Sequence, residues 1–441
     1  MRTTSAVEKI KRDFTVPIGR LYEMIAAFHA EMDKGLAGRK SPLKMIPTYV
    51  RTASGKEHGR FVALDLGGSN FRVIVLELKG AGQVKVGAVE RFSLKEGHVR
   101  GSAKDLFGFL AGAIKRSVLK AGLGNTEDFH IGFTFSFPVD QTGIANGKLV
   151  RWTKGFGVEG VEGRDVVQLL NRALASAGLK RAKVAALAND TVGTLVAESY
   201  ERKHADVGLI LGTGTNACYL ERVSHIRKLT HPVKMKDMIV NIEWGNFDKL
   251  PLTRFDRLLD AASSNPYEQV LEKMVSGMYL GEIARLAIRH LIEKGGIFDG
   301  LDAPFFDRPY SFKTEYLSGI EADGSKELKA VSGFLRKNGV LRSSYADRFA
   351  LRKIARAVSS RAAAISAAAV IAVVTKNDPL LLKPHLVAVD GTVFEKYFAF
   401  KDRMFAMLRE LAGDSAPEVR LAKDGSGVGA AIIAAVALEQ E

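Results

Sequence analysis

The chain has 441 residues, of which 46% are hydrophobic and 26% charged, a composition typical of a soluble globular protein with a substantial core. Length alone suggests about three domains. The single cysteine, Cys218, excludes an internal disulfide and fits a reducing compartment. We therefore expect a cytoplasmic protein.

The formal net charge is +15, which suits nucleic acid, an acidic membrane surface or small anions as partners. No basic helix is interleaved with aromatic residues, so a nucleic-acid partner is not expected. The segment Met1–Glu8 has no apolar stretch, so no secretory signal is predicted. The most apolar run, Ala362–Val374, is too short and too rich in alanine for a membrane span and is predicted to be a buried helix.

Residues 1–54 are predicted to be largely helical, because Tyr22, Ile25, Phe28 and Met32 recur at helical spacing. Strand pairs interleaved with helices follow. In the first half of the chain we expect a strand pair at 61–78, a helix from the capping box at Ser102 to Gly122, a strand at 129–137 and an irregular glycine-rich segment at 138–164. A helix at 166–178, a strand at 183–188 and a second strand pair at 207–222 follow. Helices are expected from 255, then a strand at 385–389 and a last helix from 425. This alternation predicts an α/β fold with no flexible linker.

Two of these segments repeat one plan of strand, tight polar turn and strand, at 61–75 and 207–220. The turn residues Gly68, Ser69 and Asn70 align with Gly214, Thr215 and Asn216. Glycines let backbone N–H groups approach an anion, and the hydroxyl and amide side chains add donors. Two such turns face to face would clamp a polyphosphate. Asp65 has Leu211 as its counterpart, which suggests that one side also manages a metal ion.

Other glycine patterns are weaker. Residues 212–217 fit the dinucleotide fingerprint G-x-G-x-x-A, but that pattern needs a helix after the turn, and a strand-like alternation follows instead. No P-loop motif occurs. Gly425–Gly429 opens the last helix and would offer free N–H groups to a phosphate.

Asn189 and Asp190 are the best candidates for chemistry, since a predicted strand ends there and a predicted helix begins. The alternative is that Asp190 is only a helix N-cap, which stabilises a helix by about 0.5–2 kcal/mol. The closeness of the pair to the second turn in sequence favours a catalytic role.

Glu243, Gln269 and Glu272 could bind vicinal hydroxyls, because the last two lie at i, i+3 on one face of a predicted helix. The pattern alone favours a solvated face. The nine histidines show no H-x-x-x-H spacing, so no zinc or iron site held by the protein is predicted. Cys218 is expected to be buried and inert.

Taken together, the motifs resemble those of the hexokinases, ATP-dependent sugar kinases of the actin-like ATPase fold. The matching segments keep their order from about residue 60 to the end. They are Leu64–Arg72 (LDLGGSNFR), Gly132–Pro138 (GFTFSFP) with Trp152–Phe156 (WTKGF), Asn189–Gly193 (NDTVG), Gly212–Tyr219 (GTGTNACY), Asn241–Gly245 (NIEWG) and Glu272–Glu282 (EKMVSGMYLGE).

The resemblance implies a two-lobed, ribonuclease H-like sugar kinase fold with a central cleft. Residues 55–188 and 425–441 would form the small lobe, and 1–54 and 189–424 the large lobe. The implied reaction moves the γ-phosphoryl of MgATP to the 6-hydroxyl of a hexose, for which we expect glucose, as the cleft closes around the sugar. ATP and Mg²⁺ are the implied cofactors.

The resemblance also carries over site residues by position. The sugar would be held by Ser136, Phe137, Thr153, Lys154, Asn189, Asp190, Asn216, Glu243, Gln269 and Glu272. The phosphates and Mg²⁺ would be held by Asp65, Gly67, Gly68, Ser69, Asn70, Arg72, Thr213 and Gly214, with Asp65 acting on the metal through water, and Gly425 and Ser426 would lie by the nucleoside. Asp190 would be the general base, and Lys154, Arg72 and Mg²⁺ would supply positive charge.

The chain departs from the family pattern at Tyr267, where glycine is usual, and at 397–400, where a usual His-Pro is missing. The loop 222–236 is basic where relatives tend to be acidic, which suggests a solvated loop or an anionic partner. Two other functions stay open at this point. A weakly catalytic sugar sensor could share the fold, but could dispense with Asp65, Lys154 and Asp190. An actin-like filament or chaperone ATPase would lack the sugar-site residues.

Overall fold

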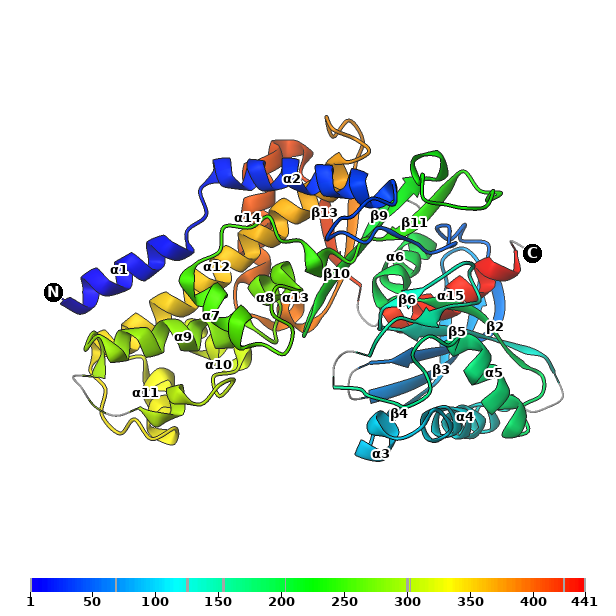
Figure 1. The fold of residues 1–441 in the computed structure, drawn as a ribbon, viewed down its shortest axis with the longest axis horizontal. Coiled ribbons are helices and arrows are strands. Elements are labelled where there is room, and N and C mark those ends of the chain that lie inside the picture. The colour runs from blue at the N-terminus through cyan, green and yellow to red at the C-terminus, as the bar shows by residue number, and fades with distance from the viewer. Residues whose placement is uncertain are drawn as a thin grey trace.

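The computed structural model describes residues 2–67, 70–123, 127–152, 155–202, 204–298, 301, 303–422 and 425–439. Two lobes, each built on a mixed sheet, lie end to end (Figure 1). One lobe adds a long stack of helices that includes the N-terminal end of the chain. The architecture is α/β, as predicted.

The first sheet has the order β4 (Val84–Ser93), β3 (Asn70–Lys79), β2 (His58–Leu66), β5 (Phe129–Phe135) and β8 (Ala182–Ala188). The first three strands are antiparallel neighbours, whereas β5 and β8 join β2 in parallel. Residues of β2 alternate between the two faces, as a strand requires. Val62 and Leu64 pack with α4 (Ala103–Lys120) and α5 (Val166–Ser176), while Ala63 packs with α15 (Gly425–Leu438).

The second sheet repeats this arrangement. Its order is β1 (Ile46–Pro47), β11 (Asp237–Asn241), β10 (Thr215–Arg222), β9 (Ala205–Leu211), β12 (Leu386–Asp390) and β13 (Glu418–Leu421). Strands β9, β10 and β11 are antiparallel, and β12 and β13 join β9 in parallel. The two predicted strand pairs are therefore confirmed as equivalent hairpins, β2–β3 and β9–β10. The strand after the second turn also excludes the dinucleotide pattern.

Helices α6 (Asp190–Glu201) and α15 cross between the two sheets. Their apolar side chains share one cluster with residues of both sheets, among them Ala63 of β2 and Ile239 of β11. A Cβ atom on Gly429 would lie 1.9 Å from the carbonyl oxygen of Gly193, so the two helices meet backbone to backbone. The predicted lobe boundary at 188/189 falls at the start of α6, and the lobe assignment stays a prediction.

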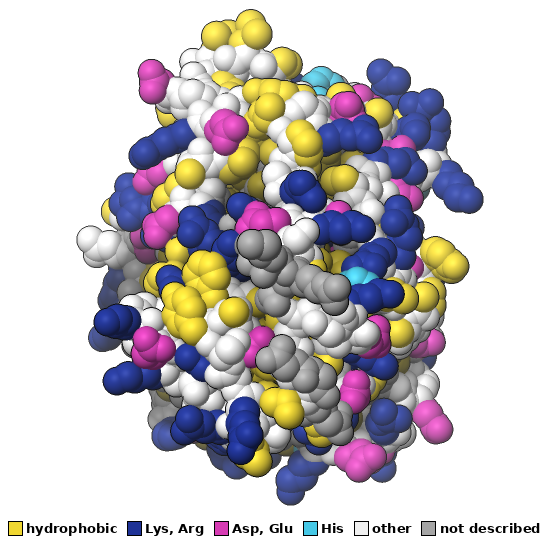
Figure 2. All heavy atoms as spheres, turned by 90° about the vertical axis from the view of Figure 1, so that its left-hand side faces the viewer, with side chains coloured by type: hydrophobic (Ala, Val, Ile, Leu, Met, Phe, Trp, Pro, Cys, Tyr) yellow, Lys and Arg dark blue, Asp and Glu magenta, His cyan; other side chains and the backbone are white. Residues whose placement is uncertain are grey.

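Most of the remaining helices belong to the second lobe, which is built on the second sheet, and form its helical stack (Figure 1). They are α1 (Arg2–Phe14), α2 (Ile18–Leu36), α7 (Arg254–Ala262), α8 (Val270–Val275), α9 (Leu280–Glu293), α10 (Thr314–Ala322), α11 (Lys329–Lys337), α12 (Tyr345–Thr375), α13 (Thr392–Lys396) and α14 (Phe400–Ala412). Figure 2 views the end of the molecule at which α1 begins, where Lys and Arg side chains are spread widely.

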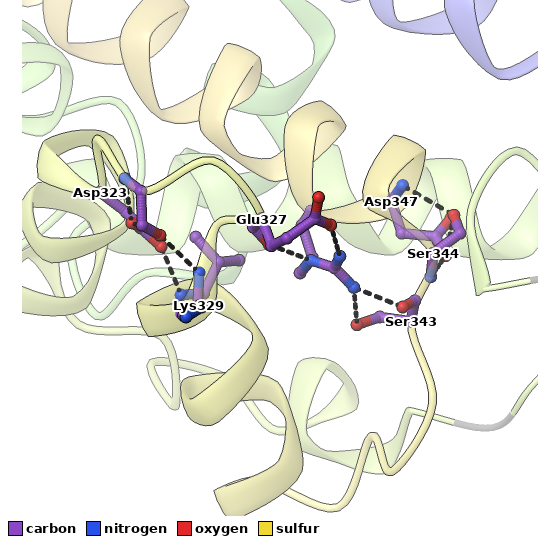
Figure 3. Close-up of polar contacts among 9 residues, drawn as sticks. Asp323, Glu327, Lys329, Ser343, Ser344 and Asp347 are labelled. Carbon is purple, nitrogen blue, oxygen red and sulfur yellow. Dashed lines mark hydrogen bonds and ion pairs between the residues drawn. The ribbon is translucent and has the colours of Figure 1, made fainter.

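Helix α12 is the central element of this helical stack. It is long and apolar enough to cross a membrane, but 89% of its most apolar window is buried inside the fold. This burial confirms the predicted core helix at 362–374. Its first turn is fixed by Ser344, which accepts a hydrogen bond from the backbone N–H of Asp347 while the Asp347 carboxylate accepts from the Ser344 backbone N–H (Figure 3).

The loop before α11 is tied to the same end of α12 (Figure 3). Arg348 donates to the carbonyl oxygens of Glu327 and Ser343. Asp323 accepts hydrogen bonds from the backbone N–H groups of Ser325 and Val331. This polar network anchors the outer edge of the second lobe.

Some predicted bounds were wrong. The strand predicted at 129–137 ends at Phe135, where its pairing with β2 stops. The N-terminal helical region ends at Leu36 rather than near residue 54. Within the segment 138–164, the structure adds a small hairpin of β6 (Val139–Asp140) and β7 (Lys148–Leu149). A short helix, α3 (Glu96–Arg100), also precedes α4.

Candidate active site

The first hairpin carries a charged pair at its turn. Asp65, the next-to-last residue of β2, lies opposite Arg72 of β3, and Arg72 Nη2 lies 2.5 Å from Asp65 Oδ2. Their side chains are only 14% and 17% exposed. Gly67 continues from β2, but Gly68, Ser69 and the Asn70 side chain lie outside the described residues. The carboxylate and guanidinium thus stand together where a phosphate-binding turn was predicted.

The second hairpin is held by a different segment of chain. The backbone N–H groups of Gly277 and Met278 donate to the carbonyl oxygens of Gly212 and Thr213, at 2.8 and 3.1 Å. The N–H of Thr215 donates to Glu272 Oε2 at 2.9 Å. The turn is therefore fixed from outside by residues 272–278.

An amide and carboxylate network begins immediately after this turn. Asn216 Nδ2 donates to Asn241 Oδ1 at 2.9 Å and to Glu243 Oε1 at 3.0 Å. Asn241 Nδ2 donates to the same Glu243 oxygen at 2.8 Å. The Asn216 amide also lies 3.4 Å from Asn189 Oδ1. Three of these residues were predicted as sugar ligands; Asn241, which is only 6% exposed, was not.

Left-handed backbone conformations position two of the predicted ligands. Glu243 has φ 56° and Gln269 has φ 54°. Gln269 is the N-cap of α8 and so precedes the helix that carries Glu272. The prediction that both lie on one helix face was therefore wrong. They still converge, because Gln269 Oε1 lies against Gly245 and Glu272 against Gly214.

The start of α6 gives Asn189 and Asp190 different roles. Asn189 is the N-cap, and its Oδ1 accepts from the backbone N–H of Thr191 at 3.0 Å. The alternative that Asp190 is the cap was wrong. Asp190 is the first helical residue and half-buried, and its Oδ1 also accepts from the Thr191 N–H at 3.0 Å.

The first lobe contributes Ser136 and Phe137, which are 8% and 3% exposed. Phe137 packs with its ring centroid 4.9 Å from both Trp152 and Phe156. Trp152 Nε1 donates to the carbonyl oxygen of Val158 at 3.0 Å. In the sequence, Trp152 and Phe156 stand on either side of Thr153 and Lys154, which lie outside the described residues.

A cavity of about 670 Å³ opens beside the second turn. Its lining includes Thr213, Gly277, Met278, Thr314, Ser318 and Thr392. Only Thr213 of these was predicted as a site residue. The predicted nucleoside residues Gly425 and Ser426 do not line it: Gly425 lies against Thr194, and the Ser426 carbonyl accepts from Thr134 Oγ1 at 3.1 Å.

Two described titratable groups close to the site have raised pKa values. Burial raises the pKa of the Cys218 thiol to about 12, which confirms the expected inert cysteine. Burial, with the charge of Glu272, raises the pKa of Tyr279 to about 12. Among the described residues, no cluster of three His, Cys, Asp or Glu side chains could hold a metal ion.

Known proteins are similar to this chain over nearly its full length. Two protein-family models, both described as Hexokinase, match residues 6–200 and 206–436 of the chain. Hexokinase-2 of Oryza sativa subsp. japonica is 40% identical over 98% of this chain and 91% of its own length. Hexokinase-1 of Schizosaccharomyces pombe is 36% identical, covering 98% of this chain and 90% of that protein.

Solved structures agree. The hexokinase from Schistosoma mansoni, complexed with glucose, superposes with a TM-score of 0.89 at 34% identity, covering 98% of this chain and 99% of that chain. Both halves of the chain, including both hairpins, fall within the family matches. The chain therefore belongs to the hexokinase family of ATP-dependent hexose kinases.

Proposed function

We propose that this protein transfers the γ-phosphoryl group of MgATP to the 6-hydroxyl of a hexose, glucose being the expected substrate. One observation carries the proposal. Asn216 directly follows the second turn, and its amide joins Glu243 to Asn189, the neighbour of Asp190. Groups suited to a sugar thus lie between a phosphate-binding turn and a carboxylate that can take up a proton. The glucose bound to the Schistosoma mansoni hexokinase supports the choice of sugar.

A hexose presents mainly hydroxyl groups, so its site needs amides and carboxylates that can pair with each one. A site built to hydrogen-bond a hydroxyl rejects an analogue without it by about 10⁴–10⁵. Asn189, Asn216 and Glu243 supply such groups from the second lobe, with Gln269 and Glu272 beside them. Ser136, Phe137, Thr153 and Lys154 are proposed to close over the sugar from the first lobe.

Asp190 is proposed to accept the proton of the 6-hydroxyl. A carboxylate is a weak base for an alcohol. A weak base suffices here, because phosphoryl transfer through a loose transition state depends mainly on alignment and charge neutralisation. Arg72 and Lys154 are proposed to neutralise the transferring group.

The nucleotide is proposed to lie across the second hairpin. Thr213 belongs both to that turn and to the lining of the 670 Å³ cavity, which is large enough for a nucleoside. A nucleoside in this cavity would direct its phosphates over the Thr213–Gly214 turn towards Asp190. A contact of Gly425 and Ser426 with the nucleoside stays a prediction.

The residues present fit a magnesium ion bound mostly by phosphates. Mg²⁺ prefers oxygen ligands and usually keeps several waters, needing only one or two carboxylates. Asp65 offers one carboxylate at the first turn, already paired with Arg72. When bound, the ion would neutralise charge on the β- and γ-phosphates. A cytoplasmic location is part of the proposal and rests on cysteine usage alone.

Replacing Asp190 with alanine tests the base directly. General-base catalysis contributes about 10²–10⁴-fold, so kcat for glucose should fall by that factor while the Kd for glucose changes little. ADP release with glucose and MgATP measures kcat, and calorimetry measures the Kd. Asp414→Ala, at an exposed position far along the chain, is the matched control.

Two outcomes would count against the proposal. A near-normal kcat for Asp190→Ala would remove Asp190 as the base. Glucose binding by the wild-type protein without ADP release above background would instead favour the weakly catalytic sugar sensor.

A further inference from the structure

A second cavity, of about 610 Å³, lies between α1, the α1–α2 junction, α12 and α14. None of its lining residues belongs to the sugar or phosphate site described above. Its apolar lining consists of Phe14, Val16, Phe349, Ala357, Ala364 and Met407. Its volume is within the range of sites that bury a small organic molecule.

The charged groups on this cavity are all cationic. Its lining includes Lys11, Arg352, Lys353, Arg356 and Arg361, and no Asp or Glu. Glu8 neutralises part of this charge, with Oε1 2.8 Å from Lys353 Nζ and Oε2 3.6 Å from Lys11 Nζ. No described acidic side chain pairs with Arg352 or Arg356, so their charge is available to a ligand.

Arg361 provides an independent sign of a ligand site. It is 2% exposed, and its two terminal nitrogens bind the Asp256 carboxylate at 2.6 and 2.7 Å. Its guanidinium carbon lies 4.7 Å from the centre of the Phe14 ring, which also lines the cavity. Its Nε is buried without a hydrogen-bond partner among the described residues. A buried donor is seldom left without an acceptor, so an acceptor group in the cavity is expected.

We propose that this cavity binds an amphiphilic organic anion, an acyl chain that ends in a carboxylate. The chain would lie against the apolar lining, and the carboxylate would be held by Arg352, Arg356 and the Nε of Arg361. A nucleotide fits less well, because the only uncharged polar side chains on the lining are the hydroxyls of Thr15 and Ser360. Neither gives the set of acceptors that a base and ribose need.

The surroundings favour capture of such an anion. The whole chain carries a net charge of +15, and Lys and Arg are spread widely over the end of the molecule at which α1 begins (Figure 2). A positive field raises the local concentration and association rate of an anion. The binding should therefore weaken as the salt concentration rises.

The test uses monomeric dodecanoate as the probe and isothermal titration calorimetry on the full chain. The expected result is saturable binding of one dodecanoate per chain. The double variant Arg352→Glu/Arg356→Glu should weaken it at least tenfold. Ala357→Trp, which fills the cavity, should abolish it. The double variant Arg352→Lys/Arg356→Lys should keep most of the affinity that the double glutamate variant loses, which separates a charge effect from misfolding.

Arg172→Glu is the matched charge control, since this exposed arginine lies on α5 in the first lobe. It should bind dodecanoate as the wild type does, and every variant should keep the wild-type unfolding midpoint and glucose-phosphorylating activity. Absence of saturable binding would overturn the proposal, as would equal affinity in the cavity variants. Equal affinity for the uncharged detergent dodecyl maltoside would show that the cationic side chains of the lining do not select an anion, and would contradict the proposal. Displacement of dodecanoate by ADP would assign the cavity to nucleotides instead.

Discussion

The two hairpins share one backbone plan but use different chemistry. Each turn joins two antiparallel strands, and in each sheet two further strands join the first strand of that pair in parallel. The first hairpin carries its own opposite charges, Asp65 and Arg72, across one register pair. The second has Leu211 and Thr215 as a register pair and takes its acidic partner, Glu272, from α8.

This difference indicates how a repeated unit can acquire two functions. Backbone N–H groups at a tight turn suit a phosphate at either copy. A carboxylate inside the hairpin adds a place for a cation, whereas neutral side chains after the second turn leave room for sugar ligands. Substitutions in the two hairpins should therefore have effects of different size and kind.

Asp65→Asn should have the largest effect, because it removes the charge that distinguishes the first turn. It keeps the shape of the side chain but leaves Arg72 without a charged partner across the register pair. Loss of one electrostatic contact in a phosphoryl-transfer site costs about 10²–10³ in kcat. Steady-state kinetics at varied Mg²⁺ should show that fall together with a higher Mg²⁺ requirement.

Leu211→Val at the equivalent position of the second hairpin is the control. A conservative change in a packed side chain costs less than about 1.5 kcal/mol in stability and should leave the Mg²⁺ requirement unchanged. If both variants shifted the Mg²⁺ requirement equally, the proposed division between the two hairpins would be wrong.

Gly214→Ala tests the second turn. A Cβ atom there would lie 2.6 Å from Glu272 Oε2, so the carboxylate must move. A displacement of about 1 Å in a substrate-positioning group can cost up to 10²-fold. We expect kcat/KM for glucose to fall by about tenfold to a hundredfold, with the Mg²⁺ requirement unchanged.

Gly108→Ala, in a helix position where a Cβ atom meets nothing within 4 Å, controls for a simple methyl addition. It should leave kcat/KM for glucose close to wild type. A Gly214→Ala enzyme with normal glucose kinetics would show that Glu272 does not position the sugar.

Much of this comparison could be predicted from sequence. The apolar runs and the glycine, serine, threonine and asparagine turns are local signals, so both hairpins were predicted together with the Asp65–Leu211 contrast. The start of α6 was also predicted. The family resemblance then supplied Glu243, Gln269 and Glu272, which the pattern alone favoured as a solvated face.

The rest depends on contacts that no local pattern encodes. Gln269 reaches the site through a left-handed backbone, not through helical spacing from Glu272. Asn241 lies at the end of a buried strand and meets Asn216 only because β10 and β11 pair. The larger cavity combines Thr213 with residues near 277, 314 and 392, which only tertiary packing brings together.

Asn241→Ala probes the amide and carboxylate network that follows the second hairpin. It removes the donor to Glu243 Oε1 and the acceptor of the Asn216 amide. A hydrogen bond to a charged group contributes about 1.5–3 kcal/mol, so loss of the Asn241 donor to Glu243 should raise the KM for glucose at least tenfold. The kcat at saturating glucose should fall much less, because Asp190 and the first hairpin are untouched.

Asn241→Asp keeps the shape but places a second carboxylate beside Glu243 and should be no better than alanine. Asn338→Ala, on α11 at the outer edge of the second lobe, is the control for a lost asparagine. If Asn241→Ala changed stability but not the KM, Asn241 would be a structural residue only.

We expect the smallest effect from a substitution of His385, which lies beside the second hairpin at the start of β12. Strand β12 flanks β9 as β5 flanks β2, and His385 directly precedes it. Its Nδ1 lies 2.5 Å from Asp206 Oδ2, and its Nε2 lies 3.2 Å from Asp378 Oδ2. Burial opposes the charged imidazole, but the hydrogen bond and charge of Asp206 and the hydrogen bond of Asp378 outweigh it and raise the pKa of His385.

The contribution of His385 to the free energy of unfolding therefore depends on pH. A pKa raised in the folded state stabilises the fold fully below the unfolded value of about 6.5, and this contribution disappears as pH rises through the folded pKa. His385→Gln should therefore lower the free energy of unfolding more at pH 6 than at pH 9, as measured by urea denaturation. His231→Gln, at an exposed histidine in the basic loop, should show no such trend. An equal penalty for His385→Gln at both pH values would mean that its charge does not stabilise this edge of the second sheet.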